Sequence, residues 1–159
     1  MGGDTLFANQ HAAFAALPPE RAAALEGLRV VHSAVAAYAP EGVYGKADAG
    51  SGRTMQPIIS EDARATMVHP LVQTHAGNGR RAIYGCWGYS IGVEGMTAEA
   101  GAALLMELLA WQTQEAFVYA HRWQPGMLVM WDNRSLLHRA TGGYDGHARL
   151  LHRTTIWEG

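Results

Sequence analysis

The sequence predicts a β-rich α+β fold of the jelly-roll class. Most apolar stretches are short, as strands are, and turn-forming glycine, proline, asparagine and aspartate residues separate them. Helical patterns are fewer, and there is no internal repeat. The chain has 159 residues, of which 48% are hydrophobic and 16% charged. This length and composition suit one domain with a real core, so we expect residues 1–159 to form a single domain.

Two helices are expected near the N-terminus. Residues 7–17 are alanine-rich and carry apolar residues at helical spacing, until Pro18 and Pro19 break the pattern. Pro19 suits the first turn of a second helix over residues 20–26, which Gly27 can close.

The next two segments carry weaker signals. Residues 29–37 are apolar, and their periodicity does not separate a helix from a strand. Residues 41–52 hold four glycines and few apolar residues, which predicts an exposed loop.

The middle of the chain predicts a hairpin and a long helix. Residues 65–74 and 81–87 are strand candidates, and the Asn-Gly turn between them is a strong hairpin signal. Thr97 is a typical N-cap for a helix over residues 98–112. An apolar stripe on this helix predicts that one face is buried, and its members are Leu104, Leu105, Leu108 and Trp111.

The C-terminal third predicts further strands. Residues 117–123 form one, and residues 127–132 form the next after a Pro-Gly turn. Residues 150–156 are another strand candidate, and residues 142–146 between them are rich in glycine, which favours a turn. We therefore expect the last two strands to fold antiparallel on one another.

This pairing would bring charged groups together. If the turn centres between Gly143 and Tyr144, His138 lies opposite Arg149. Side chains alternate along a strand, so Arg149 and Arg153 share one face. A core-facing surface does not bury arginines unless anions pair with them. The pattern therefore predicts a pocket for carboxylates, with a histidine at its edge that could hold a metal.

Several ordered motifs resemble those of the taurine dioxygenase and 2,4-dichlorophenoxyacetate dioxygenase family. They are Gly2-Gly3-Asp4-Thr5, His69-Pro70-Leu71-Val72 followed by Gly79-Arg80, Trp123-Gln124-Pro125-Gly126, and Trp131-Asp132-Asn133-Arg134 before His138. The resemblance covers essentially the whole chain. Members of this family are Fe(II)- and 2-oxoglutarate-dependent oxygenases on a double-stranded β-helix, a cupin-like jelly roll. The resemblance therefore implies that fold here.

The resemblance also implies roles for four residues. His138 resembles the family's C-terminal iron ligand, part of a facial triad of two histidines and one carboxylate. Arg149 resembles the arginine that clamps the distal carboxylate of the cosubstrate 2-oxoglutarate, and Thr5 the hydroxyl that donates to the same carboxylate. Arg153 resembles the arginine that binds the acid group of the substrate, a carboxylate or a sulfonate.

Other conspicuous residues have ordinary structural interpretations. Asp132, Asn133 and Arg134 are expected to shape the turn before His138 rather than to react. Tryptophans are expected in the core or a pocket wall, further histidines in strands or on the surface, and the thiol as a small buried group. These residues are Trp87, Trp123, Trp131, His69, His75, His121, His152 and Cys86.

The family's other two iron ligands form a His-x-Asp or His-x-Glu motif, and none of the eight histidines here begins one. The resemblance therefore implies the C-terminal part of such an enzyme, lacking the N-terminal strands of the β-helix. Three situations fit: a truncated or degraded relative, a fragment of a longer enzyme, or a second polypeptide that supplies the N-terminal half.

The resemblance implies an enzyme that hydroxylates a small organic acid while 2-oxoglutarate is decarboxylated to succinate at Fe(II). The alternative is a catalytically inactive anion-binding or structural subunit of the same fold, which the missing carboxylate ligand favours. The expected partners are a small-molecule acid and either further copies of the chain or a complementing N-terminal half.

The composition of the chain limits the kinds of partner and the cellular location that we expect. A formal net charge of −2 without a basic run makes a nucleic-acid partner unexpected. No apolar stretch approaches the roughly 18 residues of a membrane span. The N-terminus has no signal-peptide pattern, and the single Cys86 excludes an intramolecular disulfide. We therefore expect a cytoplasmic protein.

Overall fold

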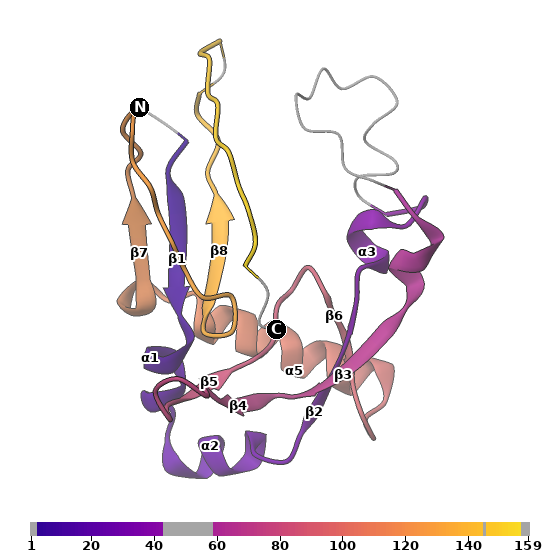
Figure 1. Ribbon diagram of the computed structural model, residues 1–159. Helices are drawn as coiled ribbons and strands as arrows, with labels where there is room; N and C mark the ends of the chain where they lie inside the picture. Colours follow the sequence, from indigo (N-terminus) through magenta and orange to yellow (C-terminus); the bar gives the residue numbers. More distant parts are fainter. Residues whose placement is uncertain (1–2, 43–58, 145, 157–159) are drawn as a thin grey trace.

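The computed structural model describes residues 3–42, 59–144 and 146–156, and within them three antiparallel sheets (Figure 1). The first sheet has the order β7-β1-β8 and the second the order β3-β2-β6, while β4 and β5 form a two-stranded hairpin. The long helix α5 crosses the lower half of the molecule, above α2 in the view of Figure 1. The described chain is therefore β-rich with antiparallel pairing, in agreement with the predicted class.

The first sheet is built around the N-terminal strand β1 (Thr5–Asn9). β1 pairs antiparallel with β7 (Val118–His121) on one side and with β8 (Leu136–Ala140) on the other. A strand from the start of the chain thus joins two strands from its last third.

The first helix starts later than the sequence predicts. α1 (Gln10–Ala15) follows β1 directly, and the side chain of Asn9 caps it by accepting a hydrogen bond from the N–H of Ala12 at 3.1 Å. Residues 7–9 are therefore strand, and their assignment to a helix is wrong. Pairing with strands on both sides outweighs the helical spacing of these residues.

The second helix forms where the sequence predicts it. α2 (Pro19–Leu25) has proline in its first turn, and Gly27 adopts φ +85° just beyond its end. The ambiguous segment that follows forms β2 (Arg29–Ser33) and then the short α3 (Val35–Tyr38). Most of the predicted loop over residues 41–52 lies outside the described residues.

The second sheet places β2 between β3 (Thr66–Pro70) and β6 (Ser90–Val93). A 3-10 turn, η1 (Glu61–Arg64), precedes β3. Val30 of β2 is fully buried, so one face of this sheet belongs to the core.

The predicted hairpin is confirmed in its turn and shorter in its strands. β4 (Val72–Thr74) pairs with β5 (Arg81–Ile83), and Gly79 has the positive φ of +68° that this turn requires. The second strand ends at Ile83, whereas the prediction extended to residue 87. The predicted first strand over residues 65–74 is divided, because its first part is β3, which pairs with β2.

The long helix confirms its predicted bounds. α5 (Ala98–Gln112) is capped by the Thr97 hydroxyl, which accepts a hydrogen bond from the N–H of Ala100 at 3.2 Å. A Cβ at Gly101 would lie 3.3 Å from the backbone nitrogen of Val93, so glycine lets the helix pack closely on β6. The short 3-10 turn η2 (Glu115–Phe117) then leads into β7.

The hydrophobic core lies between α5, the hairpin, the second sheet and the two N-terminal helices. The predicted stripe of α5 faces it, with two members buried and two packed against it. Burying one such side chain stabilises the fold by about 1.5–3 kcal/mol. The buried members of the core are Ala13, Phe14, Leu25, Val30, Leu71, Ile83, Val93, Leu105 and Leu108.

Two predicted strands are wrong. Residues 127–132 and 150–156 are not assigned to strands and pair with no strand within the described chain. Several of their apolar side chains are open to solvent, since Leu128 is 89% exposed and Leu150 is 76% exposed. An apolar stretch becomes a strand when a neighbour pairs its backbone and a second layer covers its side chains. Among the described residues neither condition holds.

The predicted register between His138 and Arg149 is wrong for the same reason. β8 pairs with β1, and this places His138 opposite Phe7. The predicted turn is present, because Gly143 and Gly146 have φ values of +87° and +79°. After it the chain descends beside β8 without joining the sheet (Figure 1).

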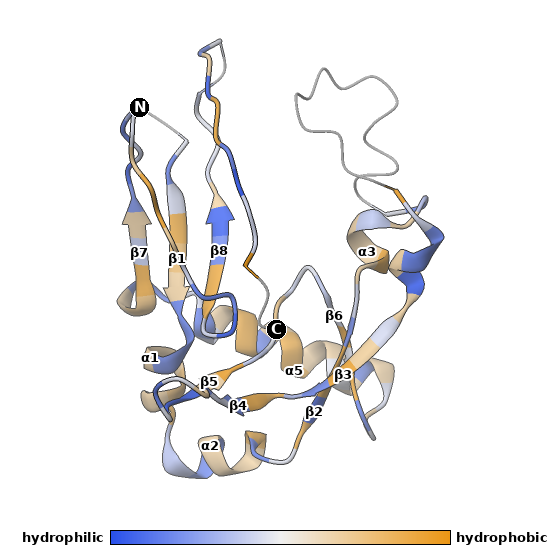
Figure 2. Cartoon of the chain, viewed as in Figure 1, coloured by the Kyte–Doolittle hydropathy of each residue, from blue (hydrophilic) through white to orange (hydrophobic). Residues whose placement is uncertain are grey.

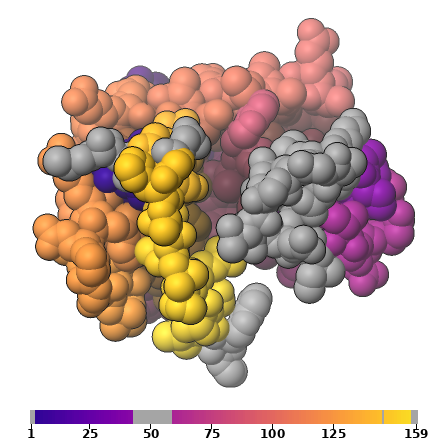
Figure 3. Space-filling model, turned by 90° about the horizontal axis from the view of Figure 1, so that it is seen from above, coloured from indigo at the N-terminus to yellow at the C-terminus, as the bar shows by residue number. Residues whose placement is uncertain are grey.

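Apolar residues are not confined to the core. Figure 2 shows them also on the loops that follow β7 and β8. Figure 3 shows the C-terminal segment on the surface of the molecule. Trp87 is 60% exposed, so its core interpretation is wrong, although it borders a small hollow with Cys86 and Leu108. No helix in the described part of the chain has the length and apolar character needed to cross a bilayer.

We predict that the isolated chain self-associates at micromolar concentration, because Leu128 and Met130 expose 89% and 78% of their surfaces on an unpaired segment. Replacing both by lysine should shift the population towards monomer in sedimentation-velocity measurements. Met106→Lys on α5, where the side chain is 47% exposed, is the matched control and should leave association unchanged. A wild-type chain that is monomeric throughout would contradict the prediction.

Candidate functional site

One face of the sheet β7-β1-β8 gathers the residues of interest. Side chains alternate along β1, so Thr5 and Phe7 point to the same side. Thr5 pairs with His121 of β7, and Phe7 pairs with His138 of β8. The register therefore puts a hydroxyl and two imidazoles on one face.

Aromatic rings surround the imidazole of His138. Its centroid lies 5.1 Å from that of Trp131 and 6.4 Å from that of Phe7, and the last two rings are 5.2 Å apart. Desolvation lowers the pKa of His138, and the positive charge of Arg153 lowers it further. The ring is therefore neutral near pH 7, which is the form that can ligate a metal.

Thr5 is buried, and its hydroxyl is oriented by a tryptophan. The indole N–H of Trp123 donates to Thr5 Oγ1 at 2.9 Å, and the ring of Trp123 meets that of His121 edge-on at 4.8 Å. A hydroxyl can accept and donate at once. The hydroxyl hydrogen of Thr5 thus remains available for an acceptor such as a carboxylate.

Arg149 is held at the same end of β1. Its Nη2 donates to the backbone carbonyl of Gly3 at 2.9 Å, and its guanidinium lies 5.1 Å from the centroid of the Tyr144 ring. Gly3 has φ +84°, and a Cβ there would be 2.9 Å from Nε of Arg149. Only glycine combines this backbone conformation with such a close approach. A guanidinium has five donors, so the bond to Gly3 leaves others for an anion.

Arg153 lies near the imidazole of His138. It lies in the exposed segment after the turn, close enough to His138 to lower the pKa of that imidazole. Arg149 thus lies at the Gly3 end of β1, and Arg153 lies near His138. The sequence predicted His138, Arg149 and Arg153 together through a direct hairpin, and the resemblance added Thr5, whereas in the structure β8 pairs with β1.

The arrangement fits a carboxylate better than a complete metal centre. Arg149 and Thr5 carry hydrogen-bond donors, and His138 carries one imidazole whose pKa is lowered. Within residues 3–42, 59–144 and 146–156, no group of three or more histidine, cysteine, aspartate or glutamate side chains is placed to hold an ion.

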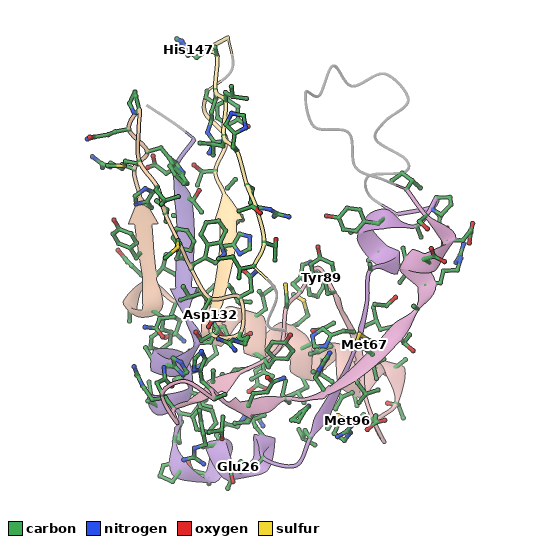
Figure 4. All side chains as sticks on the ribbon, in the orientation of Figure 1. Glu26, Met67, Tyr89, Met96, Asp132 and His147 are labelled. Atoms are coloured by element: carbon green, nitrogen blue, oxygen red, sulfur yellow. The ribbon has the colours of Figure 1, made fainter. Side chains whose placement is uncertain are left out.

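The loop before β8 is fixed by Asp132, labelled in Figure 4. Its Oδ1 accepts from the backbone N–H of Arg134 at 2.8 Å, as its predicted turn-shaping role requires, and its carboxylate also binds the guanidinium. Hydrogen bonds from Arg134, and then from His75, hold the pKa of Asp132 well below its usual range. The ionised carboxylate thus fixes the approach to His138.

The contact between His75 and Asp132 defines a tautomer. Nδ1 of His75 accepts from the N–H of Gly77 at 3.1 Å, so Nε2 carries the hydrogen in the neutral ring. Nε2 donates to Asp132 Oδ2 at 2.8 Å. The hairpin β4-β5 is thereby tied to the loop that leads to His138.

The sequence interpretation missed several contributors. His75 was assigned to a strand or the surface, yet only 12% of its side chain is exposed. Its partner lies 57 residues away, so no local signal could reveal the pair. Trp123 was expected in the core or a pocket wall, without its bond to Thr5. The Gly-Gly pair was the one available signal for the close approach of Arg149.

Comparison with known proteins is consistent across the chain. The family model described as taurine catabolism dioxygenase TauD, TfdA family, matches residues 1–155. The alpha-ketoglutarate-dependent 2,4-dichlorophenoxyacetate dioxygenase of Cupriavidus pinatubonensis is 41% identical over 157 residues, which are 98% of this chain and 50% of that protein. Pentalenolactone F synthase of Streptomyces arenae is 32% identical over 158 residues, 98% of this chain and 52% of that protein.

A solved structure also matches most of this chain and about half of its own. The crystal structure of AAD-2 in complex with Mn(II) and N-oxalylglycine superimposes with a TM-score of 0.74 at 30% sequence identity, covering 93% of this chain and 54% of that one. The chain thus spans about half the length of the relatives it matches.

We predict that Asp132→Asn lowers the free energy of unfolding by about 1–2 kcal/mol at neutral pH, a value discounted because the side chain is 34% exposed. The folded-state pKa of Asp132 is depressed. Its contribution is therefore present above the unfolded carboxyl value of about 3.9 and is lost as the pH falls below it. Urea unfolding of both proteins at a series of pH values measures this.

Asp62→Asn is the matched control, because Asp62 is an exposed carboxylate on η1, remote in sequence from this loop. It should leave stability nearly unchanged at neutral pH. If Asp132→Asn behaved like Asp62→Asn at every pH, the clamp on the loop before β8 would have no energetic role.

Proposed function

Because the chain belongs to the TauD, TfdA family of taurine catabolism dioxygenases, we propose that it forms the cosubstrate-binding part of an Fe(II)- and 2-oxoglutarate-dependent dioxygenase that hydroxylates a small organic acid. The observation that carries this proposal is the placement of Arg149 against Gly3, at the end of β1 that bears the buried Thr5.

Arg149 and Thr5 would bind the distal carboxylate of 2-oxoglutarate. The guanidinium can form two parallel hydrogen bonds with a carboxylate, and its contact with the Tyr144 ring restricts where it can lie. The Thr5 hydroxyl, oriented by Trp123, adds a neutral donor. This end of the site is preorganised, which lowers the entropy lost on binding.

His138 would be one metal ligand. Its ring is kept neutral by desolvation and by Arg153, and Trp131 and Phe7 limit its movement. Bound Fe(II) would supply dioxygen activation, with 2-oxoglutarate as the reductant that becomes succinate. The chain's own part is to orient the acid groups and to limit water around the ring.

Arg153 would bind the acid group of the substrate. It is exposed on a segment outside the sheet, in contrast to the anchored Arg149. The names of the relatives point to organic acids such as 2,4-dichlorophenoxyacetate and taurine. A carboxylate or sulfonate is therefore the substrate class that we propose.

We propose that the described sheets are part of one jelly-roll domain, a double-stranded β-helix. The two remaining metal ligands would come from residues outside this sequence, since none of its histidines begins a His-x-Asp or His-x-Glu motif. The partner would be a complementing N-terminal half or further copies of the chain. The same missing motif supports the alternative, a catalytically inactive anion-binding or structural subunit.

We predict that the chain alone binds 2-oxoglutarate with millimolar affinity at best, because a few charge-assisted hydrogen bonds of about 1.5–3 kcal/mol each must offset ordering costs. Arg149→Ala should abolish detectable binding in an NMR titration, and Thr5→Val should weaken it. Arg153→Ala should retain most of it. Equal affinity of the wild type and Arg149→Ala would contradict the assignment.

Arg139→Ala is the matched control, because Arg139 lies on β8 beside His138 with its side chain on the opposite face. It should bind like the wild type. The same titration, repeated with Fe(II) and a polypeptide carrying the family's N-terminal half, separates the two candidate functions. The enzyme predicts iron-dependent affinity and succinate formation, whereas the inactive subunit predicts neither.

A further inference from the structure

A second group of side chains with metal-binding chemistry lies on the other three-stranded sheet, β3-β2-β6. His69 of β3 pairs with Val30 of β2, so His69 shares a face with His32, two residues along β2. Tyr84 follows β5 and packs against both imidazoles. Met67, the partner of His32 in the register, is labelled on this sheet in Figure 4.

The three rings form a nearly equilateral triangle. The centroids of His32 and His69 are 5.3 Å apart, those of His69 and Tyr84 5.3 Å, and those of His32 and Tyr84 5.4 Å. A metal about 2.1 Å from a ring nitrogen lies about 3.3 Å from that ring's centroid, so two imidazoles on a tetrahedral ion have centroids about 5.4 Å apart. The observed spacing of the two histidines matches this value.

The hydrogen bonding of His32 favours one nitrogen as a ligand. Its Nε2 lies 3.2 Å from Ser90 Oγ, which itself accepts from the N–H of Cys86 at 2.9 Å. If Nε2 donates to Ser90, then Nδ1 carries the lone pair. Nδ1 is buried and has no hydrogen-bond partner among the described residues. Metal-bound histidines typically show this pattern, with the far nitrogen held by an outer partner.

A buried ring nitrogen without a hydrogen-bond partner needs a physical explanation, because an unpaired polar atom costs stability. The buried, unpaired Nδ1 of His32 is such an atom, and a bound cation would supply the partner that it lacks.

We propose that His32 Nδ1 and a ring nitrogen of His69 bind one divalent ion of the zinc type, with the phenol oxygen of Tyr84 or water completing its coordination. Imidazole suits zinc, copper and nickel, whereas calcium and magnesium prefer oxygen ligands. The ion would tie β2 to β3 and to the segment after β5. This site is separate from His138, which lies on the sheet β7-β1-β8, and it does not depend on the proposed function.

Isothermal titration of the metal-free full chain with Zn(II) near neutral pH tests the site. We expect one equivalent with micromolar affinity, and a loss of about tenfold or more in each of His32→Ala and His69→Gln. Tyr84→Phe should weaken binding less. His147→Ala and His152→Ala are the controls and should bind like the wild type, while His138→Ala tests whether the ion binds on the other sheet. Circular dichroism of each variant establishes that it is folded.

A second readout does not depend on substitutions. In long-range 1H–15N NMR spectra, Zn(II) should shift Nδ1 of His32 and one nitrogen of His69, and leave the nitrogens of His147 and His152 in place. Absence of binding, or affinity that survives both His32→Ala and His69→Gln, would overturn the proposal and leave the triangle as aromatic packing. Loss of affinity in His138→Ala alone would assign the ion to the other sheet.

Discussion

The candidate site depends on the pairing of β1 with β7 and β8 at the same time. The ladder continues beyond the strands, because Thr141 donates to Asp4 O at 2.8 Å and Gly3 donates to Gly142 O at 2.9 Å. Each such bond contributes about 0.5–1.5 kcal/mol, and leaving its groups unpaired would cost more. This continuation holds the glycine-rich turn against the start of β1. The carbonyl of Gly3 can therefore receive Arg149, which completes the arrangement.

The two arginines are held to different degrees, and this difference has a functional meaning under the proposed activity. Arg149 is fixed by the Gly3 carbonyl and the Tyr144 ring, next to a hydroxyl that Trp123 orients. Arg153 lies on an exposed segment. A fixed cation suits a cosubstrate that is the same in every turnover. A movable one suits substrates that differ among relatives, as their names indicate.

Local signals in the sequence predicted local structure well. The Thr97 cap, the Asn-Gly turn and the Pro19 start each depend on neighbouring residues, and each is confirmed. The failures concern pairing at long range. Residues 150–156 have the composition of a strand, but strand formation needs a partner that no local pattern specifies. The set of candidate site residues was predictable from ordered motifs, whereas the route through β1 and the link from His75 to Asp132 were not.

β1 lies between β7 and β8 and places Phe7 opposite His138, and the candidate site depends on this register. Nuclear Overhauser effects between backbone protons of the isotope-labelled chain test this register directly. We expect cross-strand contacts from Phe7 to both His138 and Tyr119, together with a contact between Gly3 and Gly142. Contacts from His138 to Arg149 in place of Phe7 would contradict the account and restore the hairpin that the sequence alone suggests.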